Sequence, residues 1–170
     1  AADGITVAAD MTAYNSHIYM WADDDANLTG DVTFDGTGAF GPITINSGDV
    51  VLVMGANIYS LGNAAGDVTF NVNGTVASDG GVVPREFSLA LLAEDNVGSA
   101  ANPVLLTANL AGSFLTYADA DLSQIAGSVF SHDGTLWPAI APHLPFSQGQ
   151  APDSIGEVFM DDNSVINSGQ

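Results

Sequence analysis

Three histidines supply the only side chains with an ordinary pKa near neutrality, and they stand at His17, His132 and His143. Their spacing gives none of the paired patterns that hold a metal ion. The run from Ser131 to Asp133 joins the residue types of a catalytic triad. Three consecutive side chains cannot align as nucleophile, base and orienting group, because triads are assembled from distant positions. We therefore expect no catalytic residue, and a protein that is not an enzyme.

Clustered aspartates are the second set of side chains with chemical potential, and they occur at 23–25, at 119 and 121, and at 161–162. Calcium takes about six to eight oxygen ligands and tolerates irregular loops. None of the clusters follows the calcium-binding EF-hand pattern. Asp23, Asp24 and Asp25 are the candidates for a structural Ca²⁺ site, and the alternative is a solvated acidic turn. No other cofactor is expected.

A carbohydrate-binding or carbohydrate-active module is one functional alternative, because two carboxylates suffice for glycoside hydrolysis. Such a module needs aromatic platforms for its sugars. Trp21 and Trp137 are the two tryptophans of the chain, so they are the candidates for that role.

The charge balance is strongly acidic, with 20 acids against one base, Arg85, and a formal net charge of −19. A single cation cannot neutralise phosphates, which argues against nucleic acid and against anionic membrane surfaces. The apolar run Val50–Met54 is far short of the about 20 residues of a transmembrane helix. We expect Arg85 to be structural and paired with a carboxylate. Cysteine is absent, which removes disulfides and thiol chemistry.

The elements that would have to position any site are β-strands. The densest strand signal lies in 43–80, where β-branched and apolar residues alternate with turn residues such as Asn73-Gly74. Asn-Gly is a strong hairpin signal because both positions tolerate positive φ. The pattern therefore predicts an all-β, antiparallel domain. One short apolar run, Leu89–Leu92, could form a strand or a helical turn.

An internal repeat suggests how the strands are grouped. Residues 18–34 and 58–70 both begin Ile-Tyr and end Gly-Asp-Val-Thr-Phe, and Ile5-Thr6-Val7 matches Ile43-Thr44-Ile45. Two related units, about 5–36 and 43–75, would pack as a β-sandwich or barrel. Phe34 and Phe70 would then be equivalent buried positions. The alternative is a short β-solenoid.

A proline-rich stretch, 136–152, follows the strand-rich part of the chain. Prolines exclude regular pairing, yet the stretch carries large apolar residues. This pattern predicts a β domain at 1–130 and an extended arm at 131–170, docked on its own domain or on a neighbouring subunit. The candidate interface residues are Trp137, Ile140, Leu144 and Phe146.

Two family resemblances accompany these patterns. Residues 45–53 with Asn57-Ile58-Tyr59 resemble a strand–turn–strand pattern of β-rich surface proteins of tailed phages, although the basic residue usual after Val53 is missing. The repeated Gly-Asp-Val-Thr-Phe strings resemble secreted bacterial adhesins with β-helical passengers. Either resemblance implies a non-enzymatic structural protein.

The composition and these resemblances favour a capsid decoration (cement) protein on the virion exterior. The first alternative is a subunit or fragment of a secreted filament or adhesin, and the second is the carbohydrate module. The expected partners are further copies of the chain, as a homo-oligomer, and a capsid or other assembly surface.

Overall fold

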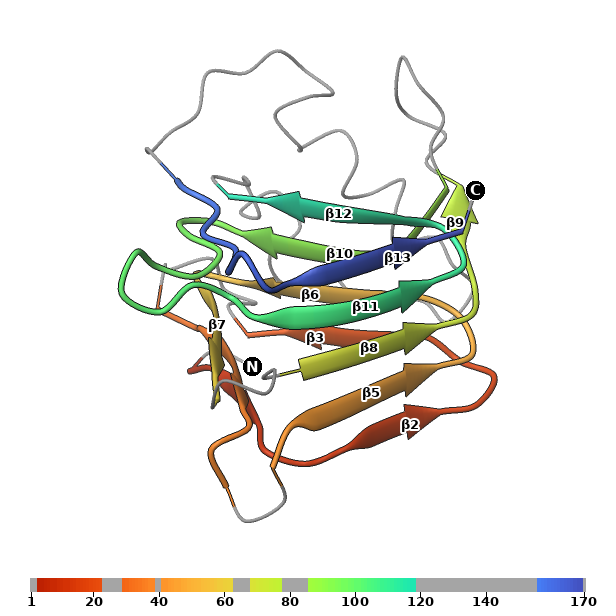
Figure 1. Ribbon diagram of the computed structural model, residues 1–170, viewed down its shortest axis with the longest axis horizontal. Helices are drawn as coiled ribbons and strands as arrows, with labels where there is room; N and C mark the ends of the chain where they lie inside the picture. The colour runs from red at the N-terminus through yellow and green to blue at the C-terminus, as the bar shows by residue number, and fades with distance from the viewer. Residues whose placement is uncertain are drawn as a thin grey trace.

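The computed structural model describes residues 3–22, 29–38, 41–62, 68–77, 86–118 and 156–169. Within these ranges the chain is all β, without a helix of any kind (Figure 1). No helix there could therefore be long and apolar enough to cross a bilayer. The strands are β1 (Ile5–Val7), β2 (Met11–Ala13), β3 (Ile18–Trp21), β4 (Val32–Asp35), β5 (Ile43–Ser47), β6 (Val51–Gly55), β7 (Ile58–Leu61), β8 (Val68–Val72), β9 (Val76–Ala77), β10 (Glu86–Ala93), β11 (Leu106–Leu110), β12 (Ser113–Tyr117) and β13 (Val165–Ser168).

Three sheets take up these strands. Sheet A has the order β1-β4-β7, sheet B the order β13-β11-β8-β5-β2, and sheet C the order β12-β10-β6-β3. All neighbours in these orders are parallel, and the short β9 pairs with β10 in the antiparallel sense. The chain visits the three faces A, B and C in turn. The first three circuits add one strand to each sheet, and after β7 the described chain continues face A only with the isolated bridges at Val97 and Val158. Figure 1 shows sheets B and C as two facing layers, with β7 crossing the edge between them. The arrangement is that of a parallel β-solenoid.

The predicted antiparallel sandwich is therefore wrong, and the alternative, a short β-solenoid, is what the strand pairing shows. Gly74, predicted to lie in an Asn-Gly hairpin, lies instead at a corner stacked on the preceding circuit. A Cβ atom on Gly74 would lie 2.5 Å from the Cα of Asp49, and the φ angle of Gly74 is not positive. Gly48 similarly stacks against the carbonyl of Tyr14. These glycines serve close approach of backbones from successive circuits, which a sequence pattern cannot distinguish from a tight hairpin turn.

The two copies of Gly-Asp-Val-Thr-Phe do not occupy equivalent places. The first copy forms β4 in sheet A, and the second forms β8 in sheet B. The Ile-Tyr pairs are displaced in the same sense, from β3 in sheet C to β7 in sheet A. The second copy of the repeat is therefore shifted by one sheet along the circuit, from sheet A to sheet B and from sheet C to sheet A. Phe34 and Phe70 are both buried in the interior, but they come from different sheets.

Sheet C is apolar on both faces in its central strands. Alternate residues of β6 and β10 point into the shared core, among them Val51, Val53, Leu89 and Leu91. The residues between them, which must face outward because side chains alternate along a strand, are also buried: Leu52, Met54, Ala90 and Leu92. Strands covered on both faces are continuous apolar runs, which explains the sequences VLVMG and EFSLALLA. The ambiguous run Leu89–Leu92 is accordingly part of a strand.

The last described stretch, 156–169, belongs to the stack although the predicted arm includes it. Val158 forms a parallel bridge with Val97, and Met160 forms one with Val104. β13 then pairs with β11 along its length. These residues thus add a fifth strand to sheet B.

Candidate functional site: an asparagine ladder on sheet B

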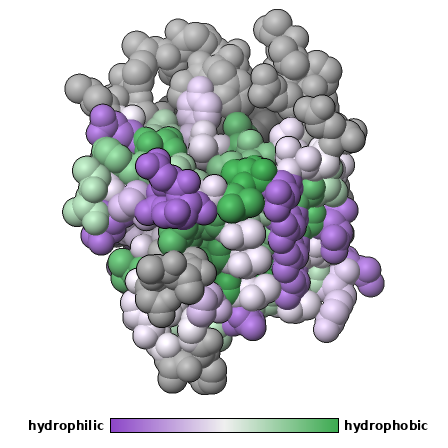
Figure 2. All heavy atoms as spheres, viewed as in Figure 1, coloured by the Kyte–Doolittle hydropathy of each residue, from purple (hydrophilic) through white to green (hydrophobic). Residues whose placement is uncertain are grey.

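A row of asparagines crosses the outer face of sheet B at one register position. β5, β8 and β11 align Asn46 with Asn71 and Asn71 with Asn109, and β13 aligns Asn167 with Asn109. At the other end of the row, Thr12 of β2 lies opposite Asn46. We refer to these five residues as the asparagine ladder. Figure 2 shows a hydrophilic stripe along this line of the surface.

The side-chain amides of the ladder form one directional chain of hydrogen bonds. The Nδ2 atoms of Asn71, Asn109 and Asn167 each donate to the Oδ1 atom of the preceding asparagine at 2.9 Å. Asn46 ends the chain by donating from Nδ2 to the Thr12 hydroxyl at 3.3 Å. Every donor therefore points toward the β2 end. Stacked amides of this kind reinforce parallel, in-register strands.

Beside the ladder runs a second column of hydroxyl groups, from Thr44, Thr69 and Thr107. Its three members share with the ladder the motif Thr-x-Asn, one copy on each of β5, β8 and β11. No strand of sheet B carries a charged residue. In a chain with a net charge of −19, the strands of this sheet thus carry amide, hydroxyl and apolar side chains only, and the exposed Asp10 directly before β2 accepts from the backbone N of Thr44.

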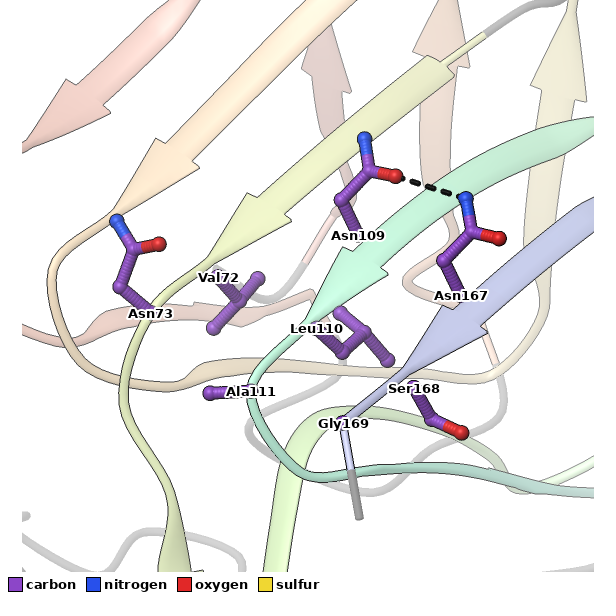
Figure 3. A pocket seen from close by; sticks show the side chains of 8 residues that line it. All are labelled: Val72, Asn73, Asn109, Leu110, Ala111, Asn167, Ser168 and Gly169. Atoms are coloured by element: carbon purple, nitrogen blue, oxygen red, sulfur yellow. Dashed lines mark hydrogen bonds between the residues drawn. The ribbon is translucent and has the colours of Figure 1, made fainter.

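A shallow depression of about 420 Å³ lies where the strands of this face end (Figure 3). Asn109 and Asn167, the two residues nearest the β13 end of the ladder, contribute to its wall with their mutual hydrogen bond. Its other lining residues are Val72, Asn73, Leu110, Ala111, Ser168 and Gly169. None of them has an acidic or basic side chain, so the depression offers hydrogen bonding and no acid–base chemistry.

A second line of polar side chains joins successive circuits at the corner that leads into sheet A. Asp31 Oδ1 accepts hydrogen bonds from the backbone N and Nδ2 of Asn57, at 3.1 and 3.0 Å. Asn57 Oδ1 accepts from the backbone N of Asn96 at 3.1 Å, and Asn96 Oδ1 accepts from the backbone N of Glu157 at 3.0 Å. These carboxylate and amide oxygens satisfy corner N–H groups, which is a structural use of polar side chains.

The single described pair of His and Asp lies at the corner between sheets B and C. His17 Nδ1 is 2.9 Å from Asp49 Oδ2, and the His17 ring stacks on Tyr19 with centroids 5.3 Å apart. Burial, reinforced by the nearby Asp49 carboxylate, raises the pKa of Tyr19. The serine of this corner, Ser47, is 1% exposed, and its Oγ donates to the Ser16 carbonyl oxygen at 2.9 Å. The corner therefore pairs a base with an acid without an accessible hydroxyl nucleophile from Ser47.

The predicted site residues divide into those described and those that lie outside the described residues. Asp23, Asp24 and Asp25, Arg85, and the interface candidates Trp137, Ile140, Leu144 and Phe146 lie outside them. In the ranges that the structure does describe, no group of three or more metal-binding side chains occurs. Asp161 forms a local turn, where its Oδ1 accepts from the backbone N and Nδ2 of Asn163. Trp21 is 8% exposed, so its ring is no open platform for a sugar.

The ladder itself escaped prediction from the sequence, although a signal for it exists. Thr-x-Asn occurs at 44–46, 69–71 and 107–109, each time within an apolar strand. The intervals between these motifs are unequal because the loops of successive circuits differ in length. No protein-family model, curated protein or solved structure matches this chain.

Proposed function

We propose that the chain is a non-enzymatic structural module of a surface filament or adhesin, in which a rigid β-solenoid acts as a stalk. The observation that carries this proposal is the continuous asparagine ladder, which links all five strands of sheet B through side chains as well as backbone. Parallel strands stacked in register give a rod whose length grows with each circuit.

The way the polar side chains are used supports the same proposal. The amides of the ladder join successive circuits through hydrogen bonds. The side chains of Asp31, Asn57 and Asn96 do the same at the corner before sheet A. The depression beside β13 lacks the acidic and basic side chains that general acid–base catalysis would require. A strong net negative charge also keeps a protein soluble at high local concentration.

Immunogold electron microscopy tests the proposal against the capsid alternative. Antibodies against the purified chain are applied to intact and to permeabilised producing cells, and to any virions that these cells release. We expect gold particles on the outer surface or on filaments of intact cells. Labelling confined to virion heads would contradict the filament proposal and support capsid decoration instead. Labelling only inside permeabilised cells would contradict both.

A further inference from the structure

The asparagine ladder has different chemical groups at its two ends. Asn167 donates to Asn109 and keeps its Oδ1 atom as an acceptor pointing along the stack. Thr12 accepts from Asn46, which leaves the hydroxyl hydrogen of Thr12 as a donor at the other end. The acceptor at the Asn167 end of the ladder thus complements the donor at the Thr12 end. A Thr12 placed one strand beyond Asn167 would continue the chain of hydrogen bonds in the same direction.

The columns of apolar side chains inside the solenoid also have ends that could cover one another. In sheet B the inward column runs from Met11 through β5, β8 and β11 to Ile166. In sheet A it runs from Ile5 through β4, β7 and Val97 to Val158. Val158 and Ile166 are 39% and 40% exposed, although their columns are otherwise core. Ile5 and Met11, at the opposite end, are partly buried against the core.

In the described part of the chain, the two end strands of sheet B each have one edge without a backbone partner. There β13 pairs only with β11, and β2 pairs only with β5. An edge strand with free N–H and C=O groups is a template for another strand. Neither strand contains a charged residue, and the carboxylate directly before β2, that of Asp10, accepts a hydrogen bond from the backbone N of Thr44 at 2.7 Å.

We propose that a second copy of this chain stacks head to tail on the first, with its β2 paired in parallel to β13. In this register Thr12 of one copy donates to Asn167 of the other, Met11 covers Ile166, and Ile5 covers Val158. The contact uses sheets A and B. Because the two surfaces differ and the translation does not close, repeated stacking gives an open filament. The proposal rests on the structural function proposed above and names the partner as the chain itself.

Association should depend on salt, because each copy brings a net charge of −19 to the stack. Screening shortens the range of repulsion to about 8 Å at physiological ionic strength and about 3 Å at 1 M. We expect sedimentation velocity of the 170-residue chain to show a mass that rises with protein concentration, and more steeply in about 1 M than in about 0.1 M NaCl. A monomer at every concentration and salt, with a folded circular dichroism spectrum, would overturn the stacking.

Two variants separate the proposed contact from general effects of charge. Ile166→Lys puts a charge at the end of the inward column and should weaken association about tenfold or more, because a charge buried without a partner is costly. Leu61→Lys is the matched control, since Leu61 is 39% exposed, close to the 40% of Ile166, but lies on β7, outside the proposed contact. It adds the same charge and should leave the association constant within about threefold, a change below about one kcal/mol. Equal effects of the two variants would contradict the proposed contact.

Disulfide trapping gives the direction of stacking, and the chain is suited to it because it has no cysteine. Paired positions of neighbouring strands lie within the Cα range of a disulfide, about 4.4–6.8 Å. A mixture of Met11→Cys and Ile166→Cys chains should form the mixed dimer in preference to either homodimer. Homodimers in preference to the mixed dimer would show a two-fold contact and overturn the head-to-tail proposal. Monomers in solution would leave the structural function within a longer chain standing, because immunogold labelling tests that function separately.

Electron micrographs supply the last measurement. Five strands of sheet B at about 4.8 Å each predict that every copy adds about 24 Å to a filament. A repeat near this value is expected in high salt. Filaments with a clearly different axial repeat would contradict continuous pairing of β13 with β2.

Discussion

The rings of Phe34 and Phe70 meet edge to face inside the solenoid, with centroids 5.5 Å apart and an interplanar angle of 85°. Phe34 comes from β4 of sheet A and Phe70 from β8 of sheet B, so the contact joins two faces of the stack. Each ring ends one copy of the repeated string Gly-Asp-Val-Thr-Phe. The repeat therefore supplies two large residues to one cluster at the centre of the core.

Removing either ring should open a cavity that the surrounding strands cannot fill. We expect Phe34→Ala and Phe70→Ala each to lower the free energy of unfolding by about 3–5 kcal/mol. The double variant should lose less than the sum, because an edge-to-face pair contributes about 0.5–1.5 kcal/mol of its own. Urea denaturation of the four proteins measures this coupling. Tyr14→Ala, at a position 85% exposed, is the control and should cost little.

The asparagine ladder predicts that one amide cannot be exchanged for a carboxylate. Asn71→Asp removes the donor to Asn46 and places a charged oxygen beside the Asn46 Oδ1 atom. We expect a loss of about 1–3 kcal/mol at neutral pH. Asn73→Asp is the control, because Asn73 is exposed and outside the ladder and the change in charge is the same.

The Asn71→Asp variant should also respond to pH in a defined direction. The introduced carboxyl group can donate to Asn46 only when it is protonated, so folding raises its pKa above the unfolded value. The stability is then retained below the unfolded pKa and lost as pH rises through the folded pKa. Thermal melting of both variants from acid to neutral pH measures the effect. Parallel melting curves for Asn71→Asp and Asn73→Asp would contradict a role for the ladder.

The stacking of corners predicts that alanine substitutions at two glycines, Gly74 and Gly38, differ sharply in their cost to stability. Gly74→Ala would bring a Cβ atom to 2.5 Å from the Cα of Asp49, so the two circuits must separate. We expect a cost of about 1–3 kcal/mol, as for overpacking. Gly38→Ala should stay within about 0.5 kcal/mol, because beyond Gly38 and its two chain neighbours nothing lies within 4 Å of the added methyl group. Equal melting temperatures of the two variants would show that the corners are loosely stacked.

Two tyrosines predict sensitivity to alkali. Burial raises the pKa of Tyr19 and of Tyr59 above the ordinary value of 10.0, and nearby carboxylates add to the shift: Asp49 for Tyr19, and Asp31 and Asp95 for Tyr59. A raised folded pKa means that the neutral form is favoured in the fold. This stability is complete below the unfolded pKa and is lost as pH rises through the folded value.

The melting temperature should therefore fall above about pH 10, the ordinary pKa of tyrosine. Tyr19→Phe and Tyr59→Phe should each reduce that fall, because the ionising hydroxyl is gone. Tyr14→Phe, at the 85% exposed position, should leave the profile as it is. A profile that neither Tyr19→Phe nor Tyr59→Phe alters would show that other groups cause the alkaline loss.

The sequence by itself determined that the described part of this chain is all β. Alternation in strings such as ITINS and VTFNV requires one buried and one wetted face, whatever the neighbouring strand is. It equally predicted that Phe34 and Phe70 are buried, because large aromatic residues within strands are seldom left in water.

Only the tertiary structure decided that the strands run parallel and in which sheet each one lies. Period-two alternation is the same for parallel and antiparallel pairing, and Gly48 and Gly74 resemble hairpin glycines until the circuit beneath them is known. The ladder depends on register between strands 25 to 58 residues apart. Register is a property of long-range pairing, and unequal loops hide it from any local pattern, which is the physical reason that the asparagines could be placed only in the folded stack.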